Sequence, residues 1–206
     1  MASSTLTRSR LSREARIEQT LAVAHDLFAE RGYATVTMDE VAAAVGVTKP
    51  LLYNYFGNKE QLYLACMEPA GEALLTAVVG AVERSATPVE ALQAGIHAFF
   101  EFVDCDRDAW RVLFDETLPV EGGIARRVGE YRERLTDLIA HALLDQIAPV
   151  HRVQVEAVST ALLGAAEALG RWWLRTEALS AAEAADLLVR TVEPGLRALV
   201  QAGRGA

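Results

Sequence analysis

The side chains best suited to a chemical task are concentrated in residues 48–59, where cationic, hydroxyl and amide groups are interspersed with apolar ones. At about 100° per residue, a helix over residues 48–56 places Leu52 and Phe56 on one face, which is suited to packing. Its other sides then present Lys49, Pro50, Leu51, Tyr53, Asn54 and Tyr55. Hydrogen-bonding and methyl-contacting groups that point outward from a short helix are what reading the DNA major groove requires. The alternatives are a solvated face for Lys49 and packing within a small domain for the two tyrosines.

This stretch is the second of two short helices that are separated by a tight turn. Thr37-Met38-Asp39-Glu40 has the pattern of a capping box, in which Thr37 caps a helix and Glu40 reaches back to it. That helix is expected over residues 38–45 and should stop at Gly46, after which Thr48 can cap the next helix. Two short helices joined in this way predict a helix-turn-helix.

Helical periodicity continues along the whole chain. Apolar residues recur at intervals of three and four, and no long stretch alternates with period two, so the expected fold class is all-α, with about nine helices and no sheet. The expected helices cover about residues 17–32, 38–45, 48–56, 58–81, 88–102, 109–118, 124–147, 149–173 and 181–201. Because proline removes a backbone hydrogen bond, Pro69 should bend or split the fourth helix and Pro194 should kink or interrupt the last.

The run Tyr33–Ala42 followed by the run Gly46–Leu62 resembles the signature of TetR-type transcriptional regulators, and the preceding helix is similar to the first helix of that family. The specific match covers about residues 15–63, whereas the remainder matches only in length and helical character. Two departures from the family pattern are Leu51, where a small hydroxyl residue is common, and Val45, where alanine is common. Leu51 bears on which bases are preferred rather than on DNA binding itself.

The resemblance implies a three-helix DNA-binding head and a helical body that binds a ligand and dimerises. It divides the chain into a basic tail (1–13), the head (14–63) and the body (64–206). It also implies a homodimer, most often a repressor, that binds a pseudo-palindromic operator in double-stranded DNA and is released by a small-molecule effector. The positions that match the family's DNA contacts are Thr37, Thr48, Lys49, Pro50, Leu51, Tyr53, Asn54, Tyr55 and Lys59.

These DNA-contacting positions are expected to have different roles. Thr37, Lys49, Tyr55 and Lys59 should mostly contact phosphates, which position the protein on the duplex. Pro50, Leu51 and Tyr53 should face base edges or thymine methyl groups.

The charge distribution is compatible with that division. The chain of 206 residues has a net charge of −8, but residues 1–65 contain seven basic and seven acidic residues, and residues 66–206 contain 13 and 21. A neutral head on an acidic body allows phosphate contacts that a uniformly acidic chain would oppose. The arginines at positions 8, 10 and 13 are either a solvated tail or an arm that reaches the DNA backbone or minor groove.

The body offers candidates for a largely apolar ligand pocket. They are His97, Phe99, Phe100, Phe102, Trp110, Phe114 and Tyr131. Ordinary core packing is the alternative for each of them, and a hydrogen-bonded core histidine is the alternative for His97. Glu167 and Arg171, four residues apart, could be a simple intrahelical pair.

A seam of small residues marks the candidate dimer interface. Ala157, Ala161, Gly164 and Ala168 are spaced by 4, 3 and 4 residues, which places them on one side of a helix. Small side chains allow close approach of a second helix, and the last helix would complete a two-fold four-helix interface. Close packing within the monomer is the alternative.

Other functional classes have little support in the sequence. We expect no enzyme, because a phosphate-binding glycine loop, a nucleophile elbow and a zinc-protease motif are all missing. We expect no cofactor and no metal site: the histidines lack ligand spacing, and Asp104, Asp106 and Asp108 imitate a calcium loop without its glycine and glutamate. The longest charge-free runs are ten residues, too short for a membrane span, and no signal peptide is expected. Two cysteines, Cys66 and Cys105, fit a reduced, cytoplasmic protein.

A ligand-responsive DNA-binding repressor is therefore the leading interpretation. One alternative is a DNA-binding or partner-binding protein that senses no ligand, which the lack of a pocket in the body would favour. A second alternative is a helical enzyme, which turnover of a bound small molecule would reveal.

Overall fold

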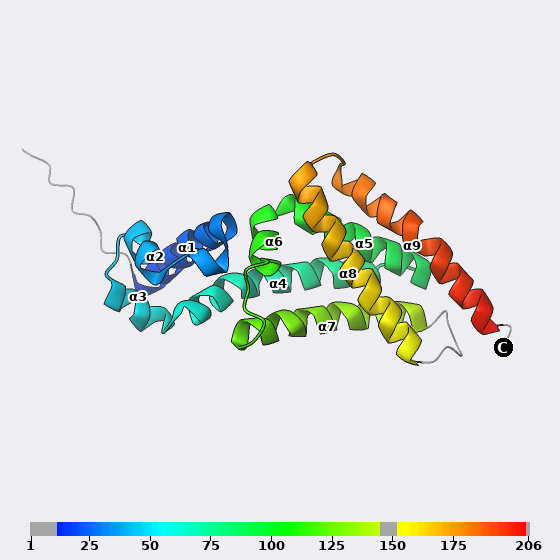
Figure 1. Ribbon diagram of the computed structural model, residues 1–206, viewed down its shortest axis with the longest axis horizontal. Helices are drawn as coiled ribbons and strands as arrows, with labels where there is room; N and C mark the ends of the chain where they lie inside the picture. The colour runs from blue at the N-terminus through cyan, green and yellow to red at the C-terminus, as the bar shows by residue number, and fades with distance from the viewer. Residues whose placement is uncertain (1–11, 145–151, 205–206) are drawn as a thin grey trace, which may run out of the picture.

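The structure, a computed structural model, describes residues 12–144 and 152–204, and these residues form nine α-helices with no strand among them. The helices are α1 (Arg13–Thr35), α2 (Met38–Val45), α3 (Lys49–Phe56), α4 (Lys59–Glu83), α5 (Pro88–Cys105), α6 (Arg107–Leu113), α7 (Gly123–Leu144), α8 (Arg152–Thr176) and α9 (Ala181–Arg204). Figure 1 shows α1–α3 at one end of an elongated molecule and α5–α9 at the other, with α4 running from one part into the other. The all-helical fold class is confirmed.

The helix ends in the head follow the predicted chemistry. The capping box of α2 is complete: the Thr37 hydroxyl accepts a hydrogen bond from the Glu40 amide at 3.3 Å, and the Thr37 amide donates to the Glu40 carboxylate at 2.9 Å. Gly46 ends α2 in the left-handed conformation (φ 74°, ψ 37°), which glycine adopts without steric cost. The Asn58 side chain caps α4 by accepting a hydrogen bond from the Gln61 amide at 2.9 Å.

Gly32 breaks α1 at the position where the sequence predicts the end of the helix, and only one short turn follows it. Its dihedral angles (φ 76°, ψ 160°) are not helical, although helical residues continue to Thr35. The break turns the backbone amides of Tyr33 and Ala34 toward the segment after α6. There they donate to the side chains of Asp115 and Thr117.

One continuous hydrophobic core joins the two parts of the molecule. Leu62, Tyr63 and Met67 of α4 are fully buried beside the head, and Leu74 and Leu75 are buried in the body. The buried Tyr63 hydroxyl donates to the carbonyl oxygen of Val112 in α6, so its polar group is satisfied. The position of the head on the body is therefore set by close packing, not by a flexible linker.

Several predicted bounds differ from the structure. Helix α6 spans Arg107–Leu113 instead of 109–118, because Asp106 caps it earlier by accepting a hydrogen bond from the Ala109 amide. Helix α4 continues through Pro69 without a split, and α9 continues through Pro194. Both helices therefore tolerate the backbone hydrogen bond that each proline removes. The predicted end at residue 147 and start at residue 149 lie outside the described residues.

Among the described helices, α4 is long and apolar enough by composition to cross a membrane, although no segment was expected to qualify. Half of its most apolar window is buried inside the structure. The helix packs against α1, α5, α6 and α7. Its apolar composition is that of a helix at the centre of a folded core.

Replacing Gly71 by alanine should destabilise the protein, although alanine is the better helix former. A Cβ atom at Gly71 would lie 2.3–2.7 Å from ring atoms of Tyr131, and overpacking of this kind costs about 1–3 kcal/mol. The matched control is Gly129→Ala in α7, where a Cβ atom meets nothing within 4 Å and a gain of about 0.5–1 kcal/mol is expected. Urea unfolding measures both changes, and equal stability of the two variants would contradict this packing.

Acid should remove the stabilisation that Glu40 provides. Hydrogen bonds from the Arg31 guanidinium and from Thr37 lower the pKa of Glu40 from 4.5 to about 2. A carboxyl group with a lowered pKa stabilises the fold above its unfolded value and loses that effect as the pH falls toward the folded value. The stability difference between wild type and Glu40→Gln should thus be constant above pH 4.5 and shrink between pH 4.5 and 2. Thermal unfolding across this pH range measures the difference, and the exposed Glu18→Gln is the control. A stability difference between wild type and Glu40→Gln that did not change with pH would contradict the lowered pKa of Glu40.

Candidate nucleic-acid interface and interior cavity

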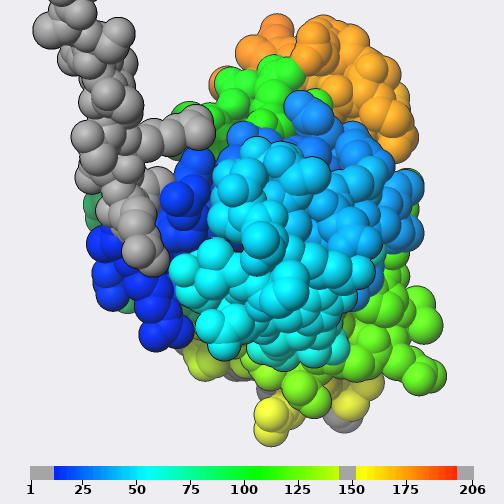
Figure 2. All heavy atoms as spheres, turned by 90° about the vertical axis from the view of Figure 1, so that its left-hand side faces the viewer, coloured from blue at the N-terminus to red at the C-terminus, as the bar shows by residue number. Residues whose placement is uncertain are grey.

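Helix α3 presents the predicted DNA-contacting face to solvent. Leu52 is fully buried, whereas Lys49, Pro50, Tyr53 and Asn54 are exposed. Leu51, Tyr55 and Phe56 are half-buried along the flanks. Figure 2 looks at this end of the molecule, where residues of α3 and the start of α4, in cyan, form the centre of the surface. The outward-facing set thus matches the face that the sequence predicts.

The two threonines of the predicted set are in different situations. The Thr37 hydroxyl donates to the Glu40 carboxylate at 2.8 Å and is part of the capping box, so it stabilises α2. Thr48 occupies the N-cap position of α3 but makes no capping hydrogen bond with its side chain. Its hydroxyl and the first amides of α3 are therefore the more suitable donors for a phosphate.

Lys49 is held by an acidic neighbour on α2. Its Nζ atom lies 2.8 Å from Oδ1 of Asp39, and both side chains are exposed. The hydrogen bond to Asp39 raises the pKa of Lys49, so the group is a permanent cation. An exposed ion pair of this kind contributes little to stability. A DNA phosphate can consequently replace Asp39 as the partner of Lys49.

Lys59, for which the sequence predicts a phosphate contact, lies against the end of α1. Its Nζ atom lies 4.4 Å above the centre of the Tyr33 ring and 3.4 Å from the Ala34 carbonyl oxygen. Desolvation in this half-buried position lowers its pKa. At the other edge of the interface, the Arg13 guanidinium lies 5.8 Å from the Tyr55 ring centre. Arg13 begins α1, whereas the arginines at positions 8 and 10 lie outside the described residues.

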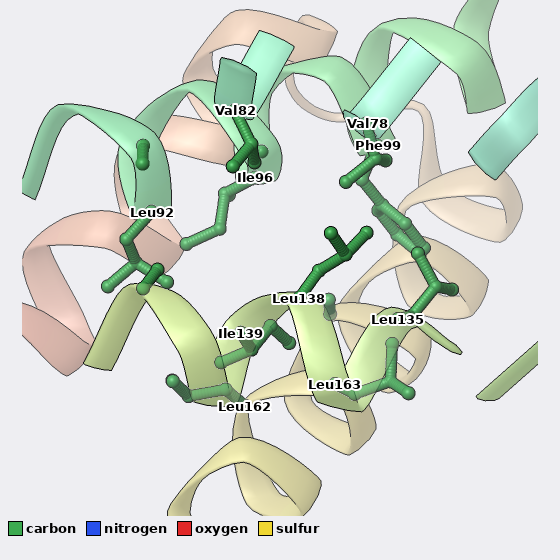
Figure 3. Close-up of a pocket in the computed structure, with 14 residues that line it drawn as sticks. Val78, Val82, Leu92, Ile96, Phe99, Leu135, Leu138, Ile139, Leu162 and Leu163 are labelled. Carbon is green, nitrogen blue, oxygen red and sulfur yellow. The ribbon is translucent and has the colours of Figure 1, made fainter. Parts of the chain in front are cut away.

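The body contains an apolar cavity of about 50 Å³ between four helices. Its lining comes from α4, α5, α7 and α8, and Figure 3 shows the labelled side chains, all hydrocarbon, converging on one space. The residues concerned are Val78, Val82, Ala91, Leu92, Gly95, Ile96, Phe99, Leu135, Leu138, Ile139, Ala142, Leu162, Leu163 and Ala166. Such a lining selects a hydrocarbon group and excludes water.

Of the seven predicted ligand residues, only Phe99 lines this cavity. Trp110 and Phe114 stack on each other with ring centres 3.9 Å apart, and Phe100 packs edge-on against Trp173. Phe102 is half-buried against the core. The remaining two make polar contacts: the Tyr131 hydroxyl donates to the Glu68 carbonyl oxygen at 3.3 Å, and His97 Nε2 lies 3.1 Å from Asp186 Oδ1 of α9.

Sequence reasoning missed the aliphatic lining because it gave priority to aromatic side chains. The cavity faces four helices, and most of its residues are leucine, isoleucine, valine and alanine, which are also the usual core residues. The only signal available was the apolar stripe of α4 near Val78 and Val82. A stripe shows that a face is buried but cannot show that a void lies behind it.

The predicted seam of small residues on α8 faces outward. Ala157, Ala161, Gly164 and Ala168 are all exposed, and a Cβ atom at Gly164 would meet nothing within 4 Å. Two larger side chains on α8 extend this apolar surface: Val153 is 73% exposed and Trp172 is 39% exposed. No part of the described chain covers the seam, so packing within the monomer does not account for it. The neighbouring Trp173, in contrast to Trp172, is buried.

Glu167 is a link between helices rather than part of a simple intrahelical pair. It is buried, and its carboxylate receives two hydrogen bonds from the Arg132 guanidinium of α7, at 2.9 and 3.0 Å. Arg171 lies 3.9 Å from Glu167 and 3.6 Å from Glu116, in the segment between α6 and α7. A bidentate pair of this type is directional and fixes the register of α7 against α8.

The segment between α6 and α7 also holds the head. Asp115 and Thr117 accept the amides of Tyr33 and Ala34 at the end of α1, as described above. The backbone amide of Gly123 donates to the Glu60 carboxylate at the start of α4, at 2.6 Å. We call residues 115–123 the latch segment. It connects α6 and α7 to the head through these hydrogen bonds.

Neither the aspartates near α6 nor the buried Cys66 is arranged for metal or redox chemistry. The described residues contain no group of three or more histidine, cysteine or acidic side chains placed to hold a metal ion. Asp106 caps α6, while Asp104 and Asp108 pair with Arg107 and Arg111, so the calcium-like spacing has a capping role. Burial raises the pKa of the Cys66 thiol to about 12, which makes it unreactive.

Comparison with known protein families assigns both parts of the chain. Residues 21–66 match the model described as bacterial regulatory proteins of the tetR family, and residues 88–193 match the tetracyclin repressor-like C-terminal domain. The first match contains the helix-turn-helix. The second contains most of the cavity and the seam of α8.

Individual proteins agree with this assignment. The chain is 32% identical over 170 residues to the HTH-type transcriptional activator FasR of Mycolicibacterium smegmatis, which covers 82% of this chain and 77% of that protein. Among solved structures, a TetR-like transcriptional regulator from Rhodococcus sp. RHA1 is 32% identical with a TM-score of 0.76, covering 91% of this chain and 99% of that one. AibR, crystallised with isovaleryl coenzyme A and operator DNA, is 26% identical with a TM-score of 0.69, covering 84% and 96%.

Lys49 and Asp39 should have opposite effects on DNA affinity. Lys49→Ala should weaken binding to duplex DNA and lower the slope of log affinity against log salt by about 1, because one phosphate contact is lost. Asp39→Asn should strengthen binding several-fold, because Lys49 then leaves no ion pair. The control is Arg84→Ala, at the end of α4 remote from the head. Fluorescence anisotropy at several salt concentrations measures each change, and an unchanged salt slope for Lys49→Ala would remove Lys49 from the interface.

Proposed function

This chain belongs to the TetR family of bacterial transcriptional regulators, and we propose that it binds a pseudo-palindromic operator as a homodimer and releases it on binding an acyl-coenzyme A effector. It is a DNA-binding regulator and not an enzyme, and as a bacterial transcription factor it acts in the cytoplasm. The proposal concerns the oligomeric state of the DNA-bound protein, its effector and whether it represses or activates transcription.

DNA recognition rests mainly on the exposed face of α3. Leu52 anchors this helix to the head, so the side chains that point away from it are held in a fixed arrangement. In the proposed complex, Lys49 and Thr48 contact phosphates, while Pro50, Leu51 and Tyr53 meet base edges and thymine methyl groups. Thr37, Asn54, Tyr55 and Lys59 complete the proposed contact set, with Thr37 and Lys59 acting chiefly through the stability of the head.

Dimerisation is proposed through α8 and α9. The exposed small residues of α8 allow a second helix to approach closely, and the exposed Trp172 and Leu187 add larger apolar contacts on α8 and α9. A two-fold axis through this surface would pair each patch with its own copy. Two heads related by two-fold symmetry match an inverted repeat in DNA.

The proposed effector class follows from the cavity and from AibR. A lining with only apolar residues suits the hydrocarbon part of an acyl chain. AibR, which shares this fold at 26% identity, was crystallised with isovaleryl coenzyme A. The cavity of about 50 Å³ is narrow, so a chain longer than a few carbons must push α5 and α7 apart. Because the interior is close-packed, this displacement reaches α4 and the head.

Repression is the proposed direction, because an operator-bound dimer at a promoter blocks polymerase until the effector releases it. Activation is the second candidate, since the relative FasR is named a transcriptional activator. A reporter gene behind the operator, compared with and without the regulator, decides between the two.

Selection on randomised duplex DNA tests the proposal as a whole. An enriched inverted repeat that is lost in Lys49→Ala/Tyr53→Ala would support operator binding. Isovaleryl-, octanoyl- and palmitoyl-coenzyme A are then added to the complex, and release by at least one of them is expected. Folded protein that enriches no sequence, also after it has been stripped of co-purified ligand and refolded, would refute the DNA-binding proposal.

Filling the cavity should uncouple ligand binding from DNA binding. Ile96→Phe adds bulk at the cavity wall, so acyl-coenzyme A affinity should fall by about tenfold or more while operator affinity is kept. Val89→Phe is the matched control, because Val89 lies on the same helix but is exposed. Calorimetry measures ligand affinity and anisotropy measures operator release. Equal release by effector in both variants would place the ligand elsewhere.

A charge on the small-residue seam should prevent dimerisation. Ala161→Arg places a long cation where close helix approach is proposed, so sedimentation should show a monomer at concentrations where the wild type is a dimer. Operator affinity should fall with it, because only one half-site is then bound per particle. Ala73→Arg, at an exposed alanine of α4, is the matched control. A dimer in Ala161→Arg would move the interface off this seam.

A further inference from the structure

We infer that the open cleft between the head and the body binds the phosphate groups of the effector, whose acyl chain extends from there into the body. This inference rests on the proposed acyl-coenzyme A response and assigns a place to the part of the ligand that an apolar cavity cannot accept. The cleft has a volume of about 400 Å³. It is bounded by α1, α6, the first residues of the latch segment and the C-terminal end of α8.

The cleft is rich in arginine, in contrast to the acidic body around it. Arg31 of α1, Arg111 of α6, and Arg171 and Arg175 of α8 all line it, against the two carboxylates of Asp115 and Glu116. Four guanidinium groups from three helices converge on one hollow of a chain whose net charge is −8. Guanidinium groups bind phosphate oxygens in pairs, so this arrangement suits a multiply phosphorylated headgroup.

Three of the four arginines are available for exchange, whereas Arg171 lies near Glu167 and Glu116. Arg31 and Arg111 each have one exposed carboxylate partner at 2.8 Å, Glu40 and Asp108 respectively. Among the described residues, Arg175 has no ion-pair partner. Exposed pairs of this kind contribute little to stability, so a phosphate can take the place of the carboxylate. The carboxylate of Asp115 is already engaged by the Tyr33 amide.

A small third space lies between the cleft and the apolar cavity and shares one lining residue with each. Leu135 lines both the apolar cavity and a small neighbouring space of about 10 Å³ between α4 and α7. Phe114 lines both that small space and the cleft. In the proposed complex, the acyl chain passes Phe114 and Leu135 to reach the cavity. Phe114 is the C-cap residue of α6, outside regular helix (φ −120°, ψ 28°), where a change of rotamer disturbs no helical turn.

This position gives the headgroup a direct influence on the DNA-binding head. The cleft includes Gly32 and Arg31 of α1 together with Asp115 and Thr117, the two residues that hold the end of α1. Phosphates drawn between Arg31 on one side and Arg171 or Arg175 on the other would change the spacing between α1 and α8. The acyl chain and the phosphates would then act on the head from two sides, through α4 and through α1.

The test compares ligands with and without the phosphates in the full chain. Isothermal titration measures binding of isovaleryl- and palmitoyl-coenzyme A, the latter below its critical micelle concentration, and of isovalerate and palmitate. In Arg111→Gln/Arg175→Gln, binding of the thioesters should weaken by about tenfold or more, because two charge-assisted hydrogen-bonding groups are lost. Binding of the free acids should change less than about twofold, since their contacts are apolar. Thermal unfolding confirms that the variant folds.

Arg84→Gln tests a different exit for the headgroup. Arg84 ends α4 close to Val82, which lines the apolar cavity. Loss of thioester binding there, with none in the double variant, would show that the headgroup leaves by that end and would overturn the inference. Equal affinity of wild type and double variant for the thioesters would overturn it as well, while the proposed function would stand. An equal loss for thioesters and free acids would overturn it by revealing general damage to the body. Wild-type protein that binds neither thioester would overturn both the inference and the proposed effector class.

Discussion

Helix α4 runs through one continuous hydrophobic core from the head into the body, and the rest of the structure depends on this packing. Its first half buries Leu62, Tyr63 and Met67 beside the head, and its second half buries Leu74 and Leu75 in the body. Because protein interiors are close-packed and deform little, the two parts cannot move independently. A displacement of α5 or α7 at the cavity is therefore carried along α4 to the recognition helix. The Pro69 position, where one backbone hydrogen bond is missing, lies between the two halves and lowers the cost of bending there.

Cations of the head form exposed ion pairs that a DNA phosphate can displace, which allows DNA binding by an acidic chain. Lys49 pairs with Asp39 and Arg31 pairs with Glu40, all at exposed positions where water screens the interaction. These pairs orient the cations in the free protein but cost little to exchange for phosphate. Arg31 also lines the cleft between the head and the body, where the proposed anion is the effector instead of DNA.

A few polar contacts on an apolar framework connect the body to the head. The bidentate pair of Arg132 and Glu167 fixes α7 against α8, and Arg171 extends this link to Glu116 in the latch segment. After the end of α6, the side chains of Asp115 and Thr117 accept hydrogen bonds from backbone amides that the break at Gly32 exposes at the end of α1. Hydrogen bonds have strict distance and angle requirements, so small shifts of the helices break them or form them. The combination of a rigid core and directional contacts produces two discrete arrangements more readily than a gradual one.

The sequence by itself determined the helix caps of the head and which face of α3 is exposed. Caps at Thr37 and Asn58, the left-handed glycine at position 46 and the apolar period of each helix are encoded within a few residues, and the exposed face of α3 follows from one buried leucine, Leu52. Only the tertiary structure decided where the body is hollow and which polar groups meet. The cavity needs walls from four helices, the Glu167 partner is 35 residues away in sequence, and the contacts of Asp115 and Thr117 span more than 80 residues. Periodicity records which side of a helix is buried, but not which helix lies opposite or whether side chains fill the space between them.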